Sequence, residues 1–206
     1  MRSARMWEQA FLILVSIGGF IIVCLPGLGT GKIRTISNWI GIFTFSIPWF
    51  ILPFTTQPKI PEMFGIVITS IGLAFFIFGL VFSMRASRKI FEVVGRAGHA
   101  EPSRLVTDGP YGFVRHPIYC GLFFAMLGWS LIWNGVYSIL LMPILYFLFR
   151  IEAKLEEKQV EKKFGESYVT YRKKVPAFFP IILAVPLIII AITIIVGIVL
   201  SQIPLS

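Results

Sequence analysis

The chain has 206 residues, of which 56% are hydrophobic and 14% charged, and its mean hydropathy is +0.83. This composition is typical of an integral membrane protein rather than a soluble domain, and the length suits one domain. The basic residues behind the net charge of +9 flank apolar runs. Membrane lipids and topology therefore explain them better than a nucleic-acid partner. Cys24 and Cys120 form neither a metal-ligand pattern nor a disulfide framework.

Three apolar runs precede the first long polar segment. The first covers residues 7–25 and ends in a loop rich in glycine and proline. Two arginines precede it, but no small-residue cleavage site follows it, so we expect an uncleaved first span. The second run, residues 37–54, contains Pro48, where we expect a kink. The third, residues 64–84, is uninterrupted and long enough to cross a membrane.

A polar loop, residues 85–117, separates these runs from two shorter ones. The short runs cover residues 118–133 and 136–151 and are joined by Asn134 and Gly135. Each would extend roughly 24 Å as a helix, which is less than the roughly 30 Å hydrocarbon core of a bilayer. We therefore expect a helical hairpin that is tilted, thin or not fully spanning.

Beyond the hairpin, the sequence predicts a charged helix over residues 152–163 and a last apolar run over residues 178–200. The expected fold class is all-α, a polytopic membrane protein with five to six transmembrane helices. We divide it into N-terminal transmembrane helices (1–84), a core with the polar loop, hairpin and charged helix (85–180), and a C-terminal transmembrane helix (181–206). The three parts form one structural unit.

The positions of the basic residues predict the orientation. Alternating six spans places Lys32, Arg34, the 85–117 loop and the 150–174 segment on one side, which then holds 16 of the 19 Lys and Arg residues. By the positive-inside rule, this side faces the cytoplasm. Both polar segments that carry reactive groups therefore share the cytoplasmic face.

The most informative stretch is residues 109–121, where the polar loop meets an apolar run. It contains Arg115, His116 and two tyrosines beside the expected membrane surface, where ionisable groups are costly unless they pair or bind a ligand. A hairpin returns its ends to one level, so this stretch should lie beside the charged helix, on which Glu152 and Glu156 share a face. Singly, these residues have plainer roles as interfacial anchors, a helix start or a solvated helix face. Together they indicate a site.

The same residues form motifs in a fixed order between positions 105 and 180. They are Leu105-Val106-Thr107-Asp108-Gly109-Pro110-Tyr111, Arg115-His116-Pro117-Ile118-Tyr119-Cys120-Gly121, Glu156-Glu157, Phe164-Gly165-Glu166-Ser167-Tyr168-Val169-Thr170-Tyr171, and Val175-Pro176 up to Pro180. In order and spacing they resemble the isoprenylcysteine carboxyl methyltransferase family of integral membrane enzymes, with its phospholipid methyltransferase-like relatives. The first three apolar runs carry no recognisable motif.

The resemblance implies that S-adenosylmethionine is the methyl donor, that S-adenosylhomocysteine is the product, and that a lipophilic or lipid-anchored acceptor enters from the bilayer. It implies a cytoplasmic pocket between the loop before the hairpin and the helix after it. We expect Arg115, His116 and Glu152 to be catalytic and no metal to be bound. The cofactor-binding residues are expected to be Arg104, Leu105, Val106, Tyr111, His116, Pro117, Ile118, Tyr119 and Glu156.

The chemistry of these side chains suits that donor. Glu156 can accept hydrogen bonds from its ammonium group or ribose hydroxyls, and Tyr or His can donate to its carboxylate. Tyr111 offers a ring face to the adenine or the sulfonium. Gly109 and Gly121 would allow the backbone to approach the cofactor closely.

Two positions depart from the family pattern. Ser103 stands where His often occurs, and Glu152 stands where related enzymes carry an Arg that faces the substrate carboxylate. A carboxylate there would repel a carboxylate acceptor, so Arg150 or Lys154 would have to replace the missing cation. A phospholipid or amine N-methyltransferase is therefore the nearest alternative, because an amine acceptor needs a base such as His116 or Glu152.

Two further alternatives stay open. A sterol-type reductase would use NADPH and shares a related helical arrangement and C-terminal motif, although the Glu-Glu pair followed by Phe-Gly-x-x-Tyr fits a methyltransferase better. A non-catalytic membrane scaffold would bind no cofactor and would tolerate Glu156→Ala. The sequence leaves the methyl acceptor and the oligomeric state open.

Overall fold

The computed structural model describes residues 2–24, 40, 44–45, 47–55, 57, 65–94 and 104–179. Every regular element in these ranges is helical, so the all-α fold class is confirmed for the described part of the chain. In chain order the elements are α1 (Arg2–Cys24), the 3-10 helix η1 (Leu52–Phe54), α3 (Gly65–Val94), the 3-10 helix η3 (Gly109–Gly112), α4 (Pro117–Ile132), α5 (Val136–Leu140), α6 (Met142–Phe164) and α7 (Glu166–Lys174).

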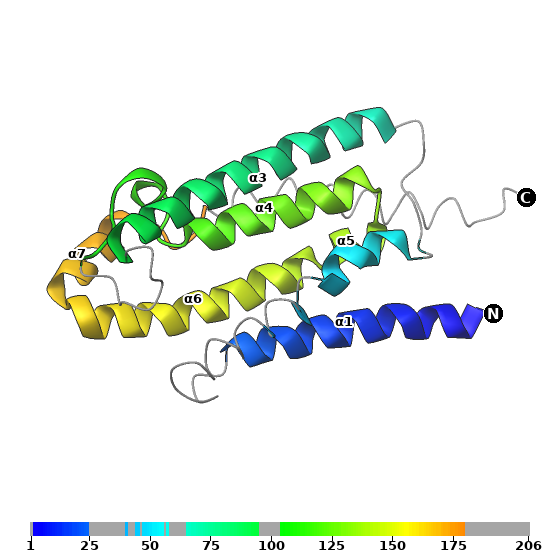
Figure 1. The fold of residues 1–206 in the computed structure, drawn as a ribbon, viewed down its shortest axis with the longest axis horizontal. Helices are drawn as coiled ribbons and strands as arrows, with labels where there is room; N and C mark the ends of the chain where they lie inside the picture. The colour runs from blue at the N-terminus through cyan, green and yellow to red at the C-terminus, as the bar shows by residue number, and fades with distance from the viewer. Residues whose placement is uncertain are drawn as a thin grey trace, which may run out of the picture.

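The closest helix pair is α3 with α4, which lie side by side (Figure 1). Four glycines make this approach possible, because Gly79 meets Gly121 and Gly72 meets Gly128. A Cβ added at Gly121 would lie 2.6 Å from the carbonyl oxygen of Gly79. Small residues at such contacts are a main source of helix packing energy in membranes. The expectation for Gly121 was therefore wrong, since its missing side chain makes room for α3 rather than for a cofactor.

One helix boundary near the site that differs from the prediction is the end of α3. The apolar run was expected to end at residue 84, but α3 continues to Val94. Ala86, Ile90 and Val93 recur at helical spacing and pack against Val106 of the following loop. This apolar stripe extends the helix through a segment whose charged residues suggested a loop.

The second difference concerns the hairpin. The expected arm over 136–151 and the expected charged helix over 152–163 are not separate, because α5 ends at Leu140 and α6 runs unbroken from Met142 to Phe164. Pro143 lies in the first turn of α6, a position where proline favours a helix start. One rigid helix therefore links the apolar bundle to the charged residues of the site.

At one end of the bundle, the η3 loop, the start of α4, the charged half of α6 and α7 lie together (Figure 1). α6 ends at Phe164 and is followed by Gly165, whose positive φ of +53° favours glycine. α7 follows at once, and three basic residues in its last turn complement the helix dipole.

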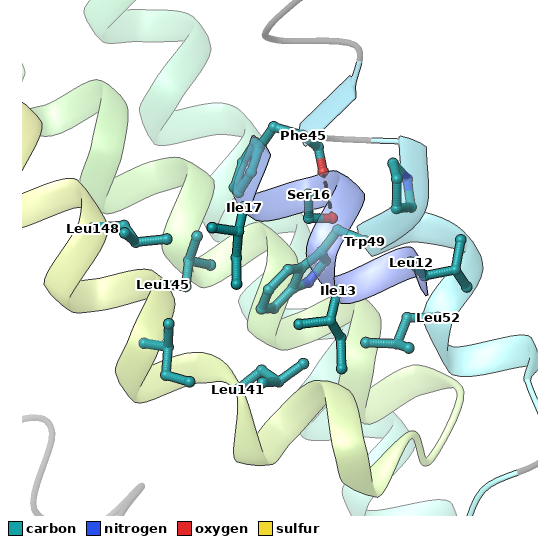
Figure 2. Close-up of a pocket in the computed structure, with 12 residues that line it drawn as sticks. Leu12, Ile13, Ser16, Ile17, Phe45, Trp49, Leu52, Leu141, Leu145 and Leu148 are labelled. Carbon is teal, nitrogen blue, oxygen red and sulfur yellow. Dashed lines mark hydrogen bonds between the residues drawn. The ribbon is translucent and has the colours of Figure 1, made fainter. Parts of the chain in front are cut away.

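On its apolar half, α6 also packs against α1 around a small cavity of about 30 Å³ (Figure 2). Ser16 of α1 donates a hydrogen bond to the carbonyl oxygen of Phe45 at 3.1 Å, which is the dashed line in Figure 2. Trp49 also lines this cavity and is 6% exposed. Its indole Nε1 is buried without a hydrogen-bond partner in the described part of the chain.

Among the described residues, one helix is long and apolar enough to cross a membrane, namely Gly65–Val93. Ala10–Gly19 and Pro117–Ile132 are shorter apolar helices. The predicted run over 178–200 lies almost wholly outside the described residues, as does Ser103, and the run over 37–54 is described in part. The count of five to six spans therefore stays a prediction.

Candidate cofactor site

A cavity of about 350 Å³ opens where the η3 loop, α4, α6 and α7 meet. All the residues predicted to bind the cofactor lie on its wall, so the structure brings them together from two segments of the chain. The full lining is Ile90, Arg104, Leu105, Val106, Tyr111, Arg115, His116, Pro117, Ile118, Tyr119, Glu156, Glu157, Val160, Phe164, Tyr168 and Tyr171.

The loop over residues 104–114 forms one wall because buried apolar side chains hold it on α3. Val106 and Tyr111 are 7% and 9% exposed and cluster with Ala86. The Tyr171 hydroxyl of α7 donates to the carbonyl oxygen of Tyr111 at 2.6 Å. The loop is thus fixed from both sides before any ligand arrives.

At the turn into η3, Gly109 has a φ of +61°, which a side chain would strain. Beside it, the Lys89 ammonium pairs with the Asp108 carboxylate at 2.9 Å. Gly109 is therefore a turn residue that lets the loop reach the Tyr111 position, and it is not itself part of the cavity wall.

A charged network forms the opposite wall. Glu157 Oε1 accepts hydrogen bonds from Arg115 Nε at 3.0 Å and Nη2 at 2.8 Å. The same oxygen lies 3.0 Å from His116 Nε2. His116 Nδ1 lies 3.4 Å from Glu156 Oε2, and the Tyr119 hydroxyl donates to Glu156 Oε1 at 2.6 Å. Both ring nitrogens of His116 therefore face carboxylates.

The two glutamates differ in how open they are. The side chain of Glu157 is 15% exposed, and those of its partners Arg115 and His116 are 11% and 9% exposed. The side chain of Glu156 is 45% exposed. Glu157 is thus the buried centre of the network, and Glu156 presents a carboxylate to the cavity.

The network shifts the pKa values of its members. Burial alone would lower the pKa of His116, but hydrogen bonds and charge from Glu156 and Glu157 outweigh it and raise the pKa. Burial alone would raise the pKa of Glu157, but hydrogen bonds from His116 and Arg115 lower it to about 2. The interaction therefore favours an imidazolium between two carboxylates.

Two tyrosines of α7 complete the wall. Burial raises the pKa of Tyr168 to about 12 and raises that of Tyr171 further. Burial likewise raises the pKa of Tyr111 across the cavity. All three phenols are neutral at physiological pH, so they serve as hydrogen-bonding groups and ring faces.

Residues 175–179, here named the return segment, lead from α7 back to the start of α4. The backbone amides of Arg115 and His116 donate to the carbonyl oxygens of Pro176 and Ala177 at 2.8 and 3.1 Å. The Arg115 guanidinium also donates to the carbonyl oxygens of Val175 at 2.5 Å and Arg172 at 3.1 Å. The guanidinium thus ties α6, α7 and the return segment together.

Of the three residues predicted to be catalytic, the structure places Arg115 and His116 in the cavity wall but not Glu152. Glu152 lies on α6 one turn before Glu156 and is partly buried. Neither Arg150 nor Lys154 lines the cavity. Lys154 is exposed, and the Arg150 guanidinium lies 5.5 Å from the ring centroid of Phe178. The catalytic roles stay predictions.

Sequence reasoning left several lining residues out of the site. Four of them belong to the motifs quoted above, which were the available signal: Glu157, Phe164, Tyr168 and Tyr171. Of the residues in these later motifs, only Glu156 was assigned a role. Two more are apolar residues within the charged stretches of α3 and α6, namely Ile90 and Val160. An apolar residue in a charged stretch was the available signal.

A family model described as phospholipid methyltransferase matches residues 67–167 of the chain. A protein-S-isoprenylcysteine O-methyltransferase from Schizosaccharomyces pombe is 44% identical over 79 residues, which are 38% of this chain and 34% of that protein. The rat protein of the same name is 28% identical over 155 residues, which are 73% of this chain and 51% of that protein. The chain thus spans about a third to a half of the length of these two relatives.

A third relative is more nearly matched in length. Protein-S-isoprenylcysteine O-methyltransferase B from Arabidopsis thaliana is 22% identical over 173 residues, which are 84% of this chain and 86% of that protein. The region that the family model matches includes all the residues that line the cavity except Tyr168 and Tyr171.

Proposed function

Because the chain belongs to the family of membrane methyltransferases that includes isoprenylcysteine O-methyltransferases and phospholipid methyltransferases, we propose that it transfers a methyl group from S-adenosylmethionine to a lipophilic carboxylate. The proposed acceptor is the carboxylate of a prenylated cysteine, which enters from the bilayer. The product of the donor is S-adenosylhomocysteine.

The cavity suits the proposed donor in size and chemistry. Its volume of about 350 Å³ lies in the range of ligand pockets. Glu156 would accept hydrogen bonds from the donor's ammonium group or ribose, and Tyr111 would present a ring face to the adenine or the sulfonium. Leu105, Val106 and Ile118 provide apolar contacts on the loop side.

The observation that carries the choice of acceptor is the environment of His116. Its ring nitrogens lie 3.0 Å from Glu157 Oε1 and 3.4 Å from Glu156 Oε2. Both nitrogens are thus engaged with carboxylates, and neither is placed to take a proton from a methyl acceptor. An amine must lose a proton before methylation, whereas a carboxylate is already ionised at neutral pH. The arrangement therefore favours O-methylation.

Charge balance supports the same acceptor. With His116 protonated, the cations Arg115 and His116 balance Glu156 and Glu157. Arg104, also on the wall, adds one positive charge, so an incoming carboxylate would approach the positively charged donor without a net negative charge on the wall to repel it. Glu152, whose charge would oppose a carboxylate, is not part of that wall.

S-adenosylmethionine, held by Glu156 and the loop residues, would supply an electrophilic methyl group to an acceptor oxygen that is already ionised, so a methyl ester and S-adenosylhomocysteine would form without release of a proton. The chain contributes position and exclusion of water rather than a proton relay. Glu156 orients the donor, and the Arg115–Glu157 pair holds His116 and the return segment in place.

The proposal also places the cavity on the cytoplasmic side of a multi-pass protein. The cavity wall contains Arg104 and Arg115 and adjoins the basic ends of α6 and α7. The positive-inside rule assigns such segments to the cytoplasm. The apolar face of α3, with Ile66 and Leu73 exposed, suits contact with lipid.

Phospholipid N-methylation is a second candidate, because the matching family model is that of a phospholipid methyltransferase. It would need a base that takes a proton from the head-group amine. Glu152, one helical turn from Glu156, is the carboxylate that our prediction assigned to this role.

The proposal is tested with purified full-length protein, methyl-tritiated S-adenosylmethionine, and two acceptors. N-acetyl-S-farnesylcysteine offers a carboxylate, and phosphatidylethanolamine vesicles offer an amine. We expect label in the farnesylcysteine product that mild base releases, as an ester requires. Base-stable label in the phospholipid alone would contradict the proposal and support N-methylation. Label in neither acceptor would leave no support for either methyl transfer.

A further inference from the structure

Phe178 of the return segment lies between the cavity wall and the apolar half of α6. Its side chain is 6% exposed. Its ring centroid lies 5.7 Å from that of His116 and 5.7 Å from that of Tyr146. The Arg150 guanidinium lies over the same ring at 5.5 Å. One side chain thus contacts a cavity residue and two residues of α6.

Phe178 is the end of a row of four stacked rings. His116 stacks on Phe178 with an interplanar angle of 21° and on Tyr119 with one of 15°. Tyr119 in turn stacks on Phe149 of α6 at 17°, with 5.3 Å between ring centroids. The row Phe178–His116–Tyr119–Phe149 is called the ring wall below.

The ring wall separates two environments. His116 and Tyr119 line the polar cavity, whereas Phe149 and Phe178 belong to the buried apolar core. On α6, the cavity begins at Glu156, and Tyr146 precedes it by roughly 15 Å along the helix axis. Among the described residues, the ring wall thus stands between the apolar half of α6 and the polar cavity.

Within the wall, Phe178 is the ring with the least restraint from secondary structure. Tyr119 and Phe149 lie inside helices, and His116 is held by two carboxylates. Phe178 lies on the non-helical return segment, beyond the last backbone hydrogen bond to His116. Its ring can therefore move without breaking helical hydrogen bonds.

We propose that Phe178 is a specificity-determining residue that limits the bulk of the acceptor head group admitted to the cavity. The inference rests on the proposed function, because it assumes a lipophilic acceptor that reaches the cavity from the apolar half. A smaller side chain at 178 would leave more space for an acceptor beside His116, and a larger one would leave less.

The neighbouring residue supplies a matched control. Phe179 has the same side chain on the same segment, but its ring contacts Phe82 of α3 and Phe124 of α4 at centroid distances of 5.6 and 5.9 Å. It contributes to the apolar core without contacting His116. Phe179→Ala thus removes the same number of atoms at a position that the inference assigns to packing alone.

The test uses full-length protein in detergent and two S-farnesylcysteine analogues that differ only in the nitrogen substituent, acetyl or the bulkier dansyl group. The readout is the ratio of kcat/KM for the dansyl analogue to that for the acetyl analogue. We expect Phe178→Ala to raise this ratio by about tenfold, the scale on which apolar pockets discriminate size. We expect Phe178→Trp to lower it and Phe179→Ala to leave it unchanged. The Kd for S-adenosylhomocysteine should match the wild type in all three variants.

The outcomes separate the inference from the proposed function. Transfer to both analogues with the same ratio in wild type, Phe178→Ala and Phe178→Trp overturns the inference alone. An equal shift in Phe179→Ala also overturns it, because a general loosening of the bundle then explains the change. Should Phe178→Ala fail to fold, the ratio in Phe178→Trp decides. Failure of the wild type to methylate either analogue overturns the proposed acceptor, and the inference with it.

Discussion

Two cavities in the described part of the chain adjoin the same helix, α6, but differ in size and in the chemistry of their walls. The larger, of about 350 Å³, combines apolar side chains with histidine, arginine, glutamate and tyrosine side chains, several of which hydrogen-bond one another. The smaller, of about 30 Å³, is walled almost wholly by aliphatic and aromatic side chains against α1 (Figure 2). Its Trp49 N–H has no hydrogen-bond partner within the described ranges.

This difference distinguishes a ligand-binding site from a cavity left by imperfect packing. Ionisable groups are costly to bury, so a cluster of them with mutual hydrogen bonds indicates a site held ready for a ligand. A small apolar cavity with one unpaired donor carries no charge complementary to a cofactor. We therefore assign ligand binding to the first cavity and only packing to the second.

The largest expected effect comes from removing the centre of the charged network. Glu157→Ala leaves Arg115 and His116 without their shared acceptor, and breaking a buried pair from one side costs about 3 kcal/mol. Glu161→Ala is the matched control on the same helix. Its pair with Arg172 is 38–41% exposed, and such surface pairs contribute about 0–1 kcal/mol. Thermal unfolding in detergent measures both, and equal losses would contradict the distinction.

The next effect is a pH dependence of stability. The Glu157 pKa is lowered from 4.5 to about 2, so its contribution is complete above pH 4.5 and is lost as the pH falls towards 2. The His116 pKa is raised above 6.5, so its contribution is complete below pH 6.5 and is lost as the pH rises through the folded value. We expect the unfolding temperature to be highest between these limits.

Glu157→Gln sharpens the pH test. It removes one of the carboxylates that raise the pKa of His116, so NMR titration should place the His116 midpoint in the variant below that of the wild type. An unchanged midpoint would show that the network does not set the charge of the imidazole.

The two cavities also differ in how well the sequence predicts them. The motifs predicted which residues meet at the larger cavity, because Arg115-His116 and Glu156 carry chemistry that is unusual in an apolar chain. The role of Glu157 was missed, since two adjacent glutamates look alike in the sequence until the fold buries Glu157 between Arg115 and His116 and leaves Glu156 more exposed. Nothing in the sequence predicted the small cavity, because its shape depends on how apolar side chains of distant segments fit.

The helix boundaries show a similar limit. The charged residues after position 84 suggested a loop, but burial of Ala86 against Val106 keeps α3 helical. The role of Gly121 was likewise decided by tertiary packing, because only the position of α3 shows which neighbour occupies the space of the missing side chain.

The smallest expected effect tests the apolar cavity. Trp49→Phe removes the buried N–H that lacks a partner but also some packing volume, so these terms oppose each other and stability should change by less than about 1 kcal/mol. Affinity for S-adenosylhomocysteine should be unchanged. A clear loss of that affinity would contradict the assignment of the smaller cavity to packing alone, since it would couple that cavity to ligand binding.

The most direct measurement of the central claim is calorimetric titration of the purified protein with S-adenosylhomocysteine. The wild type should bind at one site, and Glu156→Gln should weaken binding about tenfold, the scale of one hydrogen bond to a charged group. Glu166→Gln, the same change at an exposed position at the start of α7, should bind like the wild type. Absence of binding by the wild type, or equal binding by Glu156→Gln, would contradict the assignment of the larger cavity to the methyl donor.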